Sequence, residues 1–426
     1  MPSQKDPDMR VVVLGAGLLG VTSAYYLQQL GHEVIVIDRH ATPAAKARGR
    51  VETAVTAAAA QLLRQSAARR AARAKWLGLY VSYVSLRRRF AKLLDRVIGE
   101  APKSKPIEHL VRLGAYSRGI VRSLRDEAGV PPGQRNAGLL SFYTDADAFN
   151  ARLARASHWH ALGCEERLVS AEEALHIEPA LQALRGELAG AAYSLDDPAT
   201  RDPAQFAASM VFLCRAAGVR FLTQHTVISL KERAGRIEHV ELLDANGQPT
   251  VLRGQAYVLA LGISSAMHAE RLKIAMPFRF LREYIVTIPL KDASRAPRVA
   301  LRDRQGKLRI RRIETTGGDC LRVSSTVRAS LDEENEPDSD RVDAILHRIE
   351  SLLPGAADTA HASLQTAVHA VSRDGLPMIG KTRLFNLFLN VAPGARGWIN
   401  ACGAGKSIAR IVSGLRPEFE FAFRNP

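Results

Sequence analysis

The chain has 426 residues, of which 46% are hydrophobic and 24% charged, a composition typical of a globular protein large enough for two domains. No apolar run reaches the roughly 18 residues that a membrane-spanning helix needs, and the N-terminal MPSQKDPDMR lacks the apolar core of a secretory signal, so we expect a cytoplasmic protein. Wide spacing of the cysteines favours reduced thiols and predicts no metal site; they are Cys164, Cys214, Cys320 and Cys402.

The net charge of +16 is compatible with three kinds of surface: one for nucleic acid, one for an anionic membrane, and a solvated basic surface without a specific partner. No nucleic-acid motif accompanies the charge, so we expect no nucleic-acid partner. Residues 41–75 hold eight Lys or Arg and a single acid, Glu52, and supply +7 of the total. This segment raises the hypothesis of peripheral contact with the inner face of the plasma membrane, against the alternative of a solvated face.

The most informative stretch is VVVLGAGLLGVTSAYYLQQLGHEVIVID, residues 11–38. It predicts a buried strand, a Gly-x-Gly-x-x-Gly turn, an amphipathic helix and a second strand that ends in an acid. The turn lets the backbone approach a pyrophosphate, the helix N-terminus offers free N–H groups to it, and the acid accepts ribose hydroxyls. We therefore assign dinucleotide binding to Val11, Val12, Val13, Leu14, Gly15, Ala16, Gly17, Leu18, Leu19, Gly20, Val21, Thr22, Ser23, Ala24, Tyr25, Asp38 and Arg39.

The remaining elements follow from hydrophobic periodicity and turn residues. Residues 41–75 predict helix without a clear apolar stripe, and helical or irregular material continues to about residue 130. Further helices are expected after Ser170, over 203–217, over 341–353 and from about 405 to 413. Strands are expected over 138–143, 219–222, 227–230, 236–243, 250–252, 257–260, 387–391 and several times within 277–328, with an acidic loop over 332–340.

The order of these elements indicates an α/β protein whose Rossmann-like domain is built from separated pieces, with a β-rich, α+β substrate domain interleaved. We place the nucleotide domain at residues 9–80, 170–270 and 365–416, the substrate domain at 81–169 and 271–364, and tails at 1–8 and 417–426. Such an arrangement suits FAD, whose long body needs contacts from several parts of the chain.

Several blocks in a fixed order carry a family resemblance: MRVVVLGAGLLG near the start, AYVLALGISSAMH at 256–268, DGLPMIGKTRLFNLFLN at 374–390 and GWINACGAGKSIARIVSG at 397–414. The chain resembles the FAD-dependent D-amino acid dehydrogenases, within the D-amino acid oxidase and glycine oxidase superfamily. The resemblance implies oxidation of a D-amino acid to a 2-oxo acid and ammonia, with electrons passed to a carrier such as a membrane quinone. It implies substrate-site roles for Tyr284, Arg312 and His369, and cofactor contacts at Gly262, Gly397 and Trp398.

The chain departs from the family pattern where cofactor and substrate should meet. Residues 41–106 lack the family's Ser-, Asn- and Gly-rich text, Arg201 stands for a glycine, and His369 stands for an arginine. Three alternatives follow: a glycine- or sarcosine-type amine oxidase, a degenerate member with weak or no activity, and a gene in which two compensating frameshifts produced the Ala- and Arg-rich segment.

Overall fold

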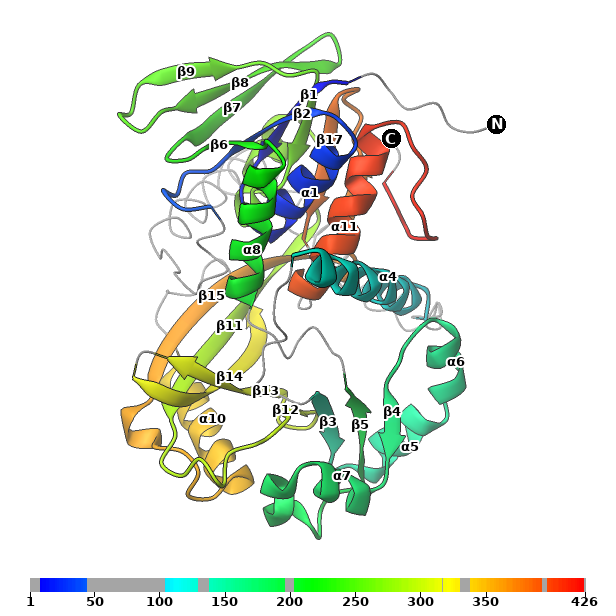
Figure 1. Cartoon of the computed structure of the whole chain (residues 1–426), viewed down its shortest axis with the longest axis vertical. Coiled ribbons are helices and arrows are strands. Elements are labelled where there is room, and N and C mark those ends of the chain that lie inside the picture. The colour runs from blue at the N-terminus through cyan, green and yellow to red at the C-terminus, as the bar shows by residue number, and fades with distance from the viewer. Residues whose placement is uncertain are drawn as a thin grey trace, which may run out of the picture.

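The structure is a computed structural model that describes residues 8–43, 104–128, 138–195, 203–315, 317–329, 338–392 and 397–424. The helix expected within 41–75, most of the acidic loop at 332–340, and Arg201 lie outside the described residues. The described chain forms two large sheets, one in each half of the molecule (Figure 1).

The six-stranded sheet begins with the predicted nucleotide-binding unit. Its strand order is β16 (Met378–Lys381), β17 (Leu387–Val391), β10 (Ala256–Leu259), β1 (Arg10–Leu14), β2 (Glu33–Ile37) and β6 (Arg220–Leu222). All neighbours pair in parallel except β16 with β17. The sequence prediction of a Rossmann-like domain assembled from distant segments is confirmed, because β1 lies between one strand that follows it closely and another that comes more than 240 residues later.

Alternate residues of β1 serve the two faces of this sheet. Val11 and Val13 belong to a core shared with the helices α1 (Leu18–Gln29), α8 (Pro203–Ala216) and α11 (Gly397–Val412). Val12 and Leu14 pack on the other face, in a core with a three-stranded sheet and α9 (Ser265–Arg271). Both faces are covered, which explains why the strand reads as a continuous apolar run.

Helix α1 is not the amphipathic helix that the sequence predicts. Its residues Leu19 to Tyr25 are all buried, because α11 and α8 pack against it as well as the sheet. Helix α4 (Ser104–Ala128) in turn packs on α11. A helix enclosed by helices and a sheet has no polar stripe to present to water.

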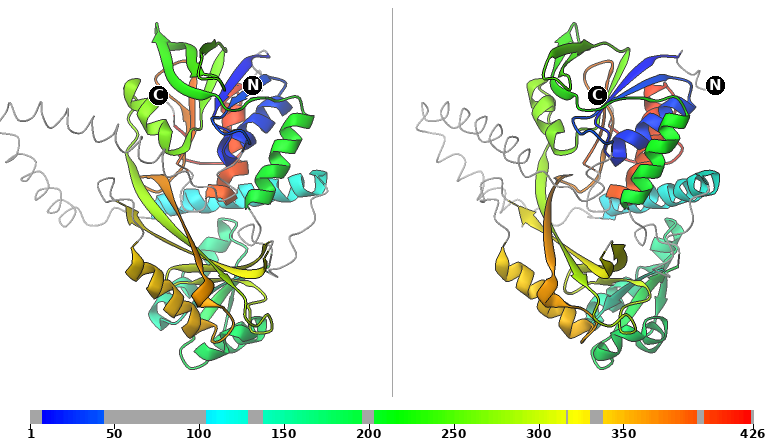
Figure 2. Two further views of the ribbon diagram at one scale, coloured as in Figure 1. Left: turned by 90° about the vertical axis from the view of Figure 1, so that its left-hand side faces the viewer. Right: turned by 60° about the vertical axis from the view of Figure 1, so that its left-hand side comes forward.

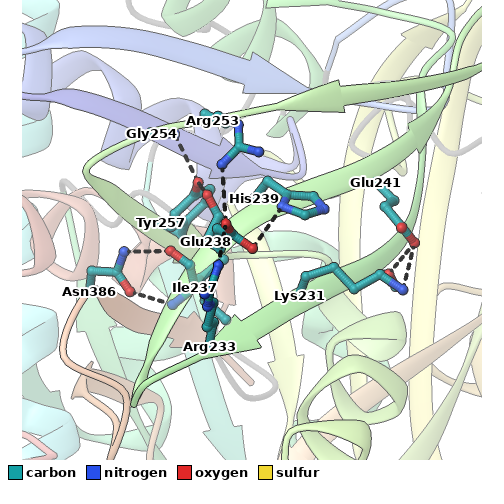
Figure 3. Close-up of polar contacts among 11 residues, drawn as sticks. Lys231, Arg233, Ile237, Glu238, His239, Glu241, Arg253, Gly254, Tyr257 and Asn386 are labelled. Carbon is teal, nitrogen blue, oxygen red and sulfur yellow. Dashed lines mark hydrogen bonds and ion pairs between the residues drawn. The ribbon is translucent and has the colours of Figure 1, made fainter.

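The three-stranded sheet is fastened to the nucleotide-binding sheet by two buried side chains (Figure 3). It consists of β7 (Thr226–Arg233), β8 (Arg236–Leu243) and β9 (Pro249–Leu252), and includes the predicted hairpin. The Asn386 amide exchanges two hydrogen bonds with the backbone of Ile237, at 2.8 and 2.9 Å. The hydroxyl of Tyr257, on β10, donates to the backbone carbonyl oxygen of Glu238 on β8 at 3.4 Å and accepts the backbone N–H of Gly254 at 2.8 Å.

The second half of the molecule is an eight-stranded sheet. In spatial order its strands are β15 (Ser363–Ser372), β11 (Phe278–Pro289), β14 (Gly318–Ala329), β13 (Leu308–Thr315), β12 (Ala300–Asp303), β3 (Leu139–Tyr143), β5 (Gly190–Ser194) and β4 (Arg167–Val169). One face is apolar and is covered by α10 (Ser339–Leu352), α7 (Ala171–Ile177) and a 3₁₀ helix at Pro179–Leu184. Figure 2 shows α10 against the lower side of this sheet, with α4 and the six-stranded sheet above it.

Sheet membership differs from the proposed domain boundaries in two places. Residues 171–194, which the sequence assigned to the nucleotide domain, supply β5 and the helices under the second sheet, and β15 joins that sheet as well.

No helix among the described residues combines the length and the apolar character required to cross a membrane.

The last helix begins at Gly397, eight residues earlier than the sequence predicts. Gly403 and Gly405 lie inside it, where each permits close contact with a neighbouring helix. A Cβ atom at Gly405 would lie 2.6 Å from Oγ1 of Thr22 on α1, and one at Gly403 would lie 2.5 Å from Oγ of Ser117 on α4. These glycines are therefore packing positions inside the helix, whereas the sequence prediction started the helix at about residue 405.

Candidate cofactor and substrate site

The glycine turn between β1 and α1 has the geometry that a diphosphate requires. Gly15 has a φ of +107°, and a Cβ there would lie 2.5 Å from the carbonyl oxygen of Ala260. A Cβ at Gly20 would lie 1.7 Å from the carbonyl oxygen of Gly15. Gly17, by contrast, has no heavy atom within 4 Å of that position. Two glycines make the turn, and the middle one leaves open space at the helix N-terminus, where a phosphate group fits against free N–H groups.

Asp38 follows β2 and faces this turn. Its Oδ2 accepts the backbone N–H of Ala16 at 2.7 Å, and its Oδ1 accepts the N–H of His40 at 2.8 Å. The carboxylate thus ties the glycine turn to the end of β2. Each carboxylate oxygen can accept a second hydrogen bond, so this arrangement is compatible with a ribose hydroxyl. Arg39 directs its Nε to the His40 ring at 3.3 Å.

The other predicted cofactor residues divide into those at the turn and those that support it. The side chains of Val11 to Leu14 are fully buried in the two cores. Thr22 donates from its hydroxyl to the carbonyl oxygen of Ala401 at 2.9 Å, which joins α1 to α11. Gly262, with a φ of +61° and open space around it, follows β10 at the same edge of the sheet. Gly397 starts α11, and the side chain of Trp398 lies outside the described residues.

A polar cluster lies on the second sheet, on the face away from α10. His369 on β15 contacts Glu283 on β11, with 2.8 Å between Nε2 and Oε2. Arg309 on β13 and Ser324 on β14 are close enough to act on the same carboxylate. Partial burial opposes ionisation of Glu283, but the hydrogen bond from His369 and the charges of His369 and Arg309 outweigh it, so the pKa of Glu283 lies below its usual value. We call these four residues the Glu283 cluster.

Strand alternation separates the three substrate-site residues that the resemblance suggested. Cross-strand partners in a sheet point to the same side. His369 opposes Leu281 and therefore shares a face with Glu283. Tyr284 points to the opposite, helix-covered face, is 2% exposed, and accepts the backbone N–H of Asp338 at 3.2 Å. Arg312 shares that face and donates to Asp319 at 2.6 Å.

The structure consequently brings His369 to the polar face without Tyr284 or Arg312. Glu283 was not predicted from the sequence. The alternation of side chains between the two faces of the sheet, along β11 and β13, would have indicated which residues share its face. Within β13, Arg309 and Arg311 lie on the same face of the sheet as Ser324. Ile310 and Arg312 lie on the opposite, helix-covered face. Reading that alternation would have favoured Arg309 and Arg311 over Arg312.

Comparison with known proteins defines the family. The family model described as FAD dependent oxidoreductase (DAO) matches residues 10–411. The chain belongs to this family of FAD-dependent oxidoreductases. The open space at Gly17 and the helix N-terminus beside it fit the diphosphate of the family's cofactor, FAD.

Curated relatives match over nearly the whole chain. A D-amino acid dehydrogenase of Dechloromonas aromatica (strain RCB) is 33% identical over 429 residues, covering 97% of this chain and 99% of that protein. A D-amino acid dehydrogenase of Rhizorhabdus wittichii is 32% identical over 425 residues, covering 97% and 98%.

Solved structures share the fold at low sequence identity. Glycine oxidase from Geobacillus kaustophilus superposes with a TM-score of 0.67 at 18% identity, with 97% of each chain covered. L-proline dehydrogenase from P. horikoshii superposes with a TM-score of 0.71 at 16% identity, covering 97% of this chain and 94% of that one. These likenesses confirm the α/β architecture with its interleaved second domain.

Proposed function

We propose that this oxidoreductase deaminates D-amino acids to 2-oxo acids and ammonia and passes the electrons to a carrier other than oxygen. The observation that supports this most strongly is the full-length similarity to proteins named D-amino acid dehydrogenase, at up to 33% identity. The balanced reaction consumes one D-amino acid, one water and one oxidised carrier, and yields a 2-oxo acid, ammonia and the reduced carrier.

FAD, when bound, takes up the hydrogen and the two electrons that leave the substrate Cα. The chain's own residues bind and orient. The Gly17 turn and the first turn of α1 would hold the diphosphate, and Asp38, which braces the turn, would hold the ribose. After Cα–H is lost, a carbon–nitrogen double bond forms, and water hydrolyses the resulting imine.

The substrate carboxylate needs a cation, and we assign this role to the arginines of the polar face. Arg309, a member of the Glu283 cluster, and Arg311 lie on that face, and a guanidinium pairs with a carboxylate through two parallel hydrogen bonds. The ionised carboxylate of Glu283, held by His369, accepts a hydrogen bond from the substrate's amino group. Anion and cation on one face thereby match the two charges of an amino acid.

An anaerobic flavin titration tests the proposal. FAD-loaded protein receives D-alanine, then a panel of other D-amino acids, with L-alanine as the stereochemical control. Bleaching of the flavin absorbance by a D-amino acid and not by L-alanine is the expected result. Bands that persist throughout the panel would contradict the proposal and favour the degenerate relative.

The arginine assignment has its own matched comparison. Arg309→Gln should raise KM for the D-amino acid at least tenfold, because one charge-assisted pair is lost. Arg312→Gln tests the earlier sequence assignment in the same strand. A large rise in KM for Arg312→Gln with none for Arg309→Gln would refute the choice of face.

The second candidate is a glycine- or sarcosine-type amine oxidase, which the glycine oxidase fold favours. Oxygen consumption with peroxide release on glycine or sarcosine would support it, whereas turnover only with a dye or quinone supports the dehydrogenase. A membrane quinone as carrier, with peripheral contact to the membrane through the basic 64–75 segment, is the finer hypothesis. Salt-sensitive binding to anionic vesicles, lost when Arg69, Arg70 and Arg73 are neutralised, would support it.

A further inference from the structure

A cleft lined by three arginines and two aromatic rings lies far from the glycine turn, at the outer part of the eight-stranded sheet. It has a volume of about 320 Å³ and lies between the end of β3, the helices α5 (Ala146–Leu153) and α6 (Ala156–Ala161), and the turn that joins β12 to β13. Figure 1 shows α5 and α6 in the lower half of the molecule, away from α1 and the six-stranded sheet. The cleft is at the small end of the range for ligand pockets and is too small for a dinucleotide.

Three arginines line this cleft: Arg152, Arg155 and Arg304. The Arg152 guanidinium uses Nη2 to donate to Glu166 at 3.0 Å, while its Nη1 is buried and has no hydrogen-bond partner within the described chain. Neither Arg155 nor Arg304 forms an ion pair with any acid that the structure describes. The buried, unpaired Nη1 of Arg152 carries a desolvation cost, and the exposed guanidinium groups of Arg155 and Arg304 beside it are available to pair with an anion.

Aromatic rings hold two of these arginines in place. The guanidinium carbon of Arg152 lies 5.8 Å from the ring centre of Trp159, and that of Arg304 lies 5.7 Å from the ring centre of Tyr143. Cation–π contact uses the flat face of a guanidinium and leaves its N–H edge available. The arrangement therefore fixes the orientation of both groups before any ligand binds.

The acidic residue of the cleft does not cancel this charge. Asp145 is the single carboxylate in the lining, and it caps α5 by accepting the backbone N–H groups of Asp147 and Ala148 at 2.9 and 3.3 Å. Because Glu166 already pairs with Arg152, the two remaining guanidinium groups, those of Arg155 and Arg304, outnumber the one carboxylate of the lining and leave the cleft positive. Its lining suits a compact anion that presents several oxygens at once.

We propose that this cleft binds the phosphoryl group of a small, soluble phosphorylated compound. Phosphate offers enough oxygens for two arginine forks, whereas a carboxylate satisfies one. The ligand enters separately from FAD and the substrate, so the site is suited to modulate the enzyme rather than to take part in the reaction.

Isothermal titration of the FAD-loaded protein with pyrophosphate, at constant ionic strength, tests the proposal. Loading with FAD fills the glycine turn, so that binding there cannot be mistaken for binding at the cleft. We expect one saturable site, at least tenfold weaker in the Arg155→Gln/Arg304→Gln double variant. Both side chains are exposed, so thermal unfolding of the variant should match that of the wild type.

The matched control is Arg167→Gln, which removes an exposed arginine of β4 that pairs with Glu173 outside the cleft. Its affinity for pyrophosphate should stay within twofold of wild type. Absence of a saturable site, equal affinity in wild type and double variant, or tighter binding of malonate than of pyrophosphate would overturn the proposal. Phosphatidic acid vesicles that bind where pyrophosphate does not would also overturn it, in favour of a lipid headgroup.

Discussion

His268 should make the stability of this protein fall as the pH falls from 7.5 to 5. It lies on α9, is 2% exposed, and its Nδ1 has no hydrogen-bond partner within the described chain. Burial, reinforced by the positive charge of Arg271, lowers the pKa of His268 to about 4. The imidazole is therefore neutral in the folded protein at pH 5, but charged in the unfolded chain.

The size of the effect follows from the difference between the two pKa values. Between pH 4 and 6.5 the unfolded state binds more protons than the folded state, so stability falls as pH falls. Taking about 6.5 for the unfolded chain, His268 alone removes about 2 kcal/mol of unfolding free energy between pH 7.5 and pH 5.

Urea unfolding at a series of pH values measures this contribution in wild type and in His268→Gln. The difference between the two unfolding free energies should change by about 2 kcal/mol across that range, since glutamine does not titrate. Ser265→Ala is the control on the same helix, because its buried hydroxyl also lacks a partner within the described chain but carries no charge. Its curve should run parallel to that of wild type. Parallel curves for wild type and His268→Gln would show that this histidine is not buried as described.

Three further predictions test packing and chemistry elsewhere. Gly405→Ala should lower the unfolding free energy by about 1–3 kcal/mol, because the new Cβ would clash with Thr22. The control Gly119→Ala, which adds a Cβ in open space on α4, should raise the unfolding free energy by about 0.5–1 kcal/mol. Equal effects of the two substitutions would contradict the packing argument. In native protein a thiol reagent should label Cys164 and spare Cys402, because burial raises the pKa of the Cys402 thiol; early modification of Cys402, by mass spectrometry, would count against this. Gly17→Ala should abolish flavin absorbance in the purified protein and leave the unfolding of the apoprotein unchanged. The reason is that the new Cβ contacts no protein atom and occupies only the space proposed for the diphosphate. Flavin retained in the variant would refute that role of Gly17.

The βαβ unit could be predicted from the sequence because its information is local. Gly15, Gly17 and Gly20 occupy the turn as expected, and Asp38 faces it. The beginning of α11 was missed because the helix was predicted to start only at about residue 405, after Gly403. A glycine that permits close helix packing is indistinguishable from a loop glycine until the neighbouring helix is known.

The polar face of the second sheet was harder to predict because it depends on strands far apart in sequence. Glu283 and His369 meet across 86 residues, on adjacent strands. The resemblance supplied Arg312 by position along the chain, whereas its face depends on the register of β13 against β14. A shift of one residue moves every side chain of a strand to the other side of its sheet.

The interleaved strand order has a consequence during synthesis. The strands β1 and β2 leave the ribosome early, yet β17, which completes the parallel part of their sheet, ends at Val391. At translation rates of about 5–20 residues per second, the gap between Ile37 and Val391 corresponds to roughly 20–70 s. For that time one edge of the growing apolar sheet is unpaired, first that of β1 until β10 is made and then that of β10, so the nascent chain should depend on a chaperone, and its yield should fall when chaperones are depleted.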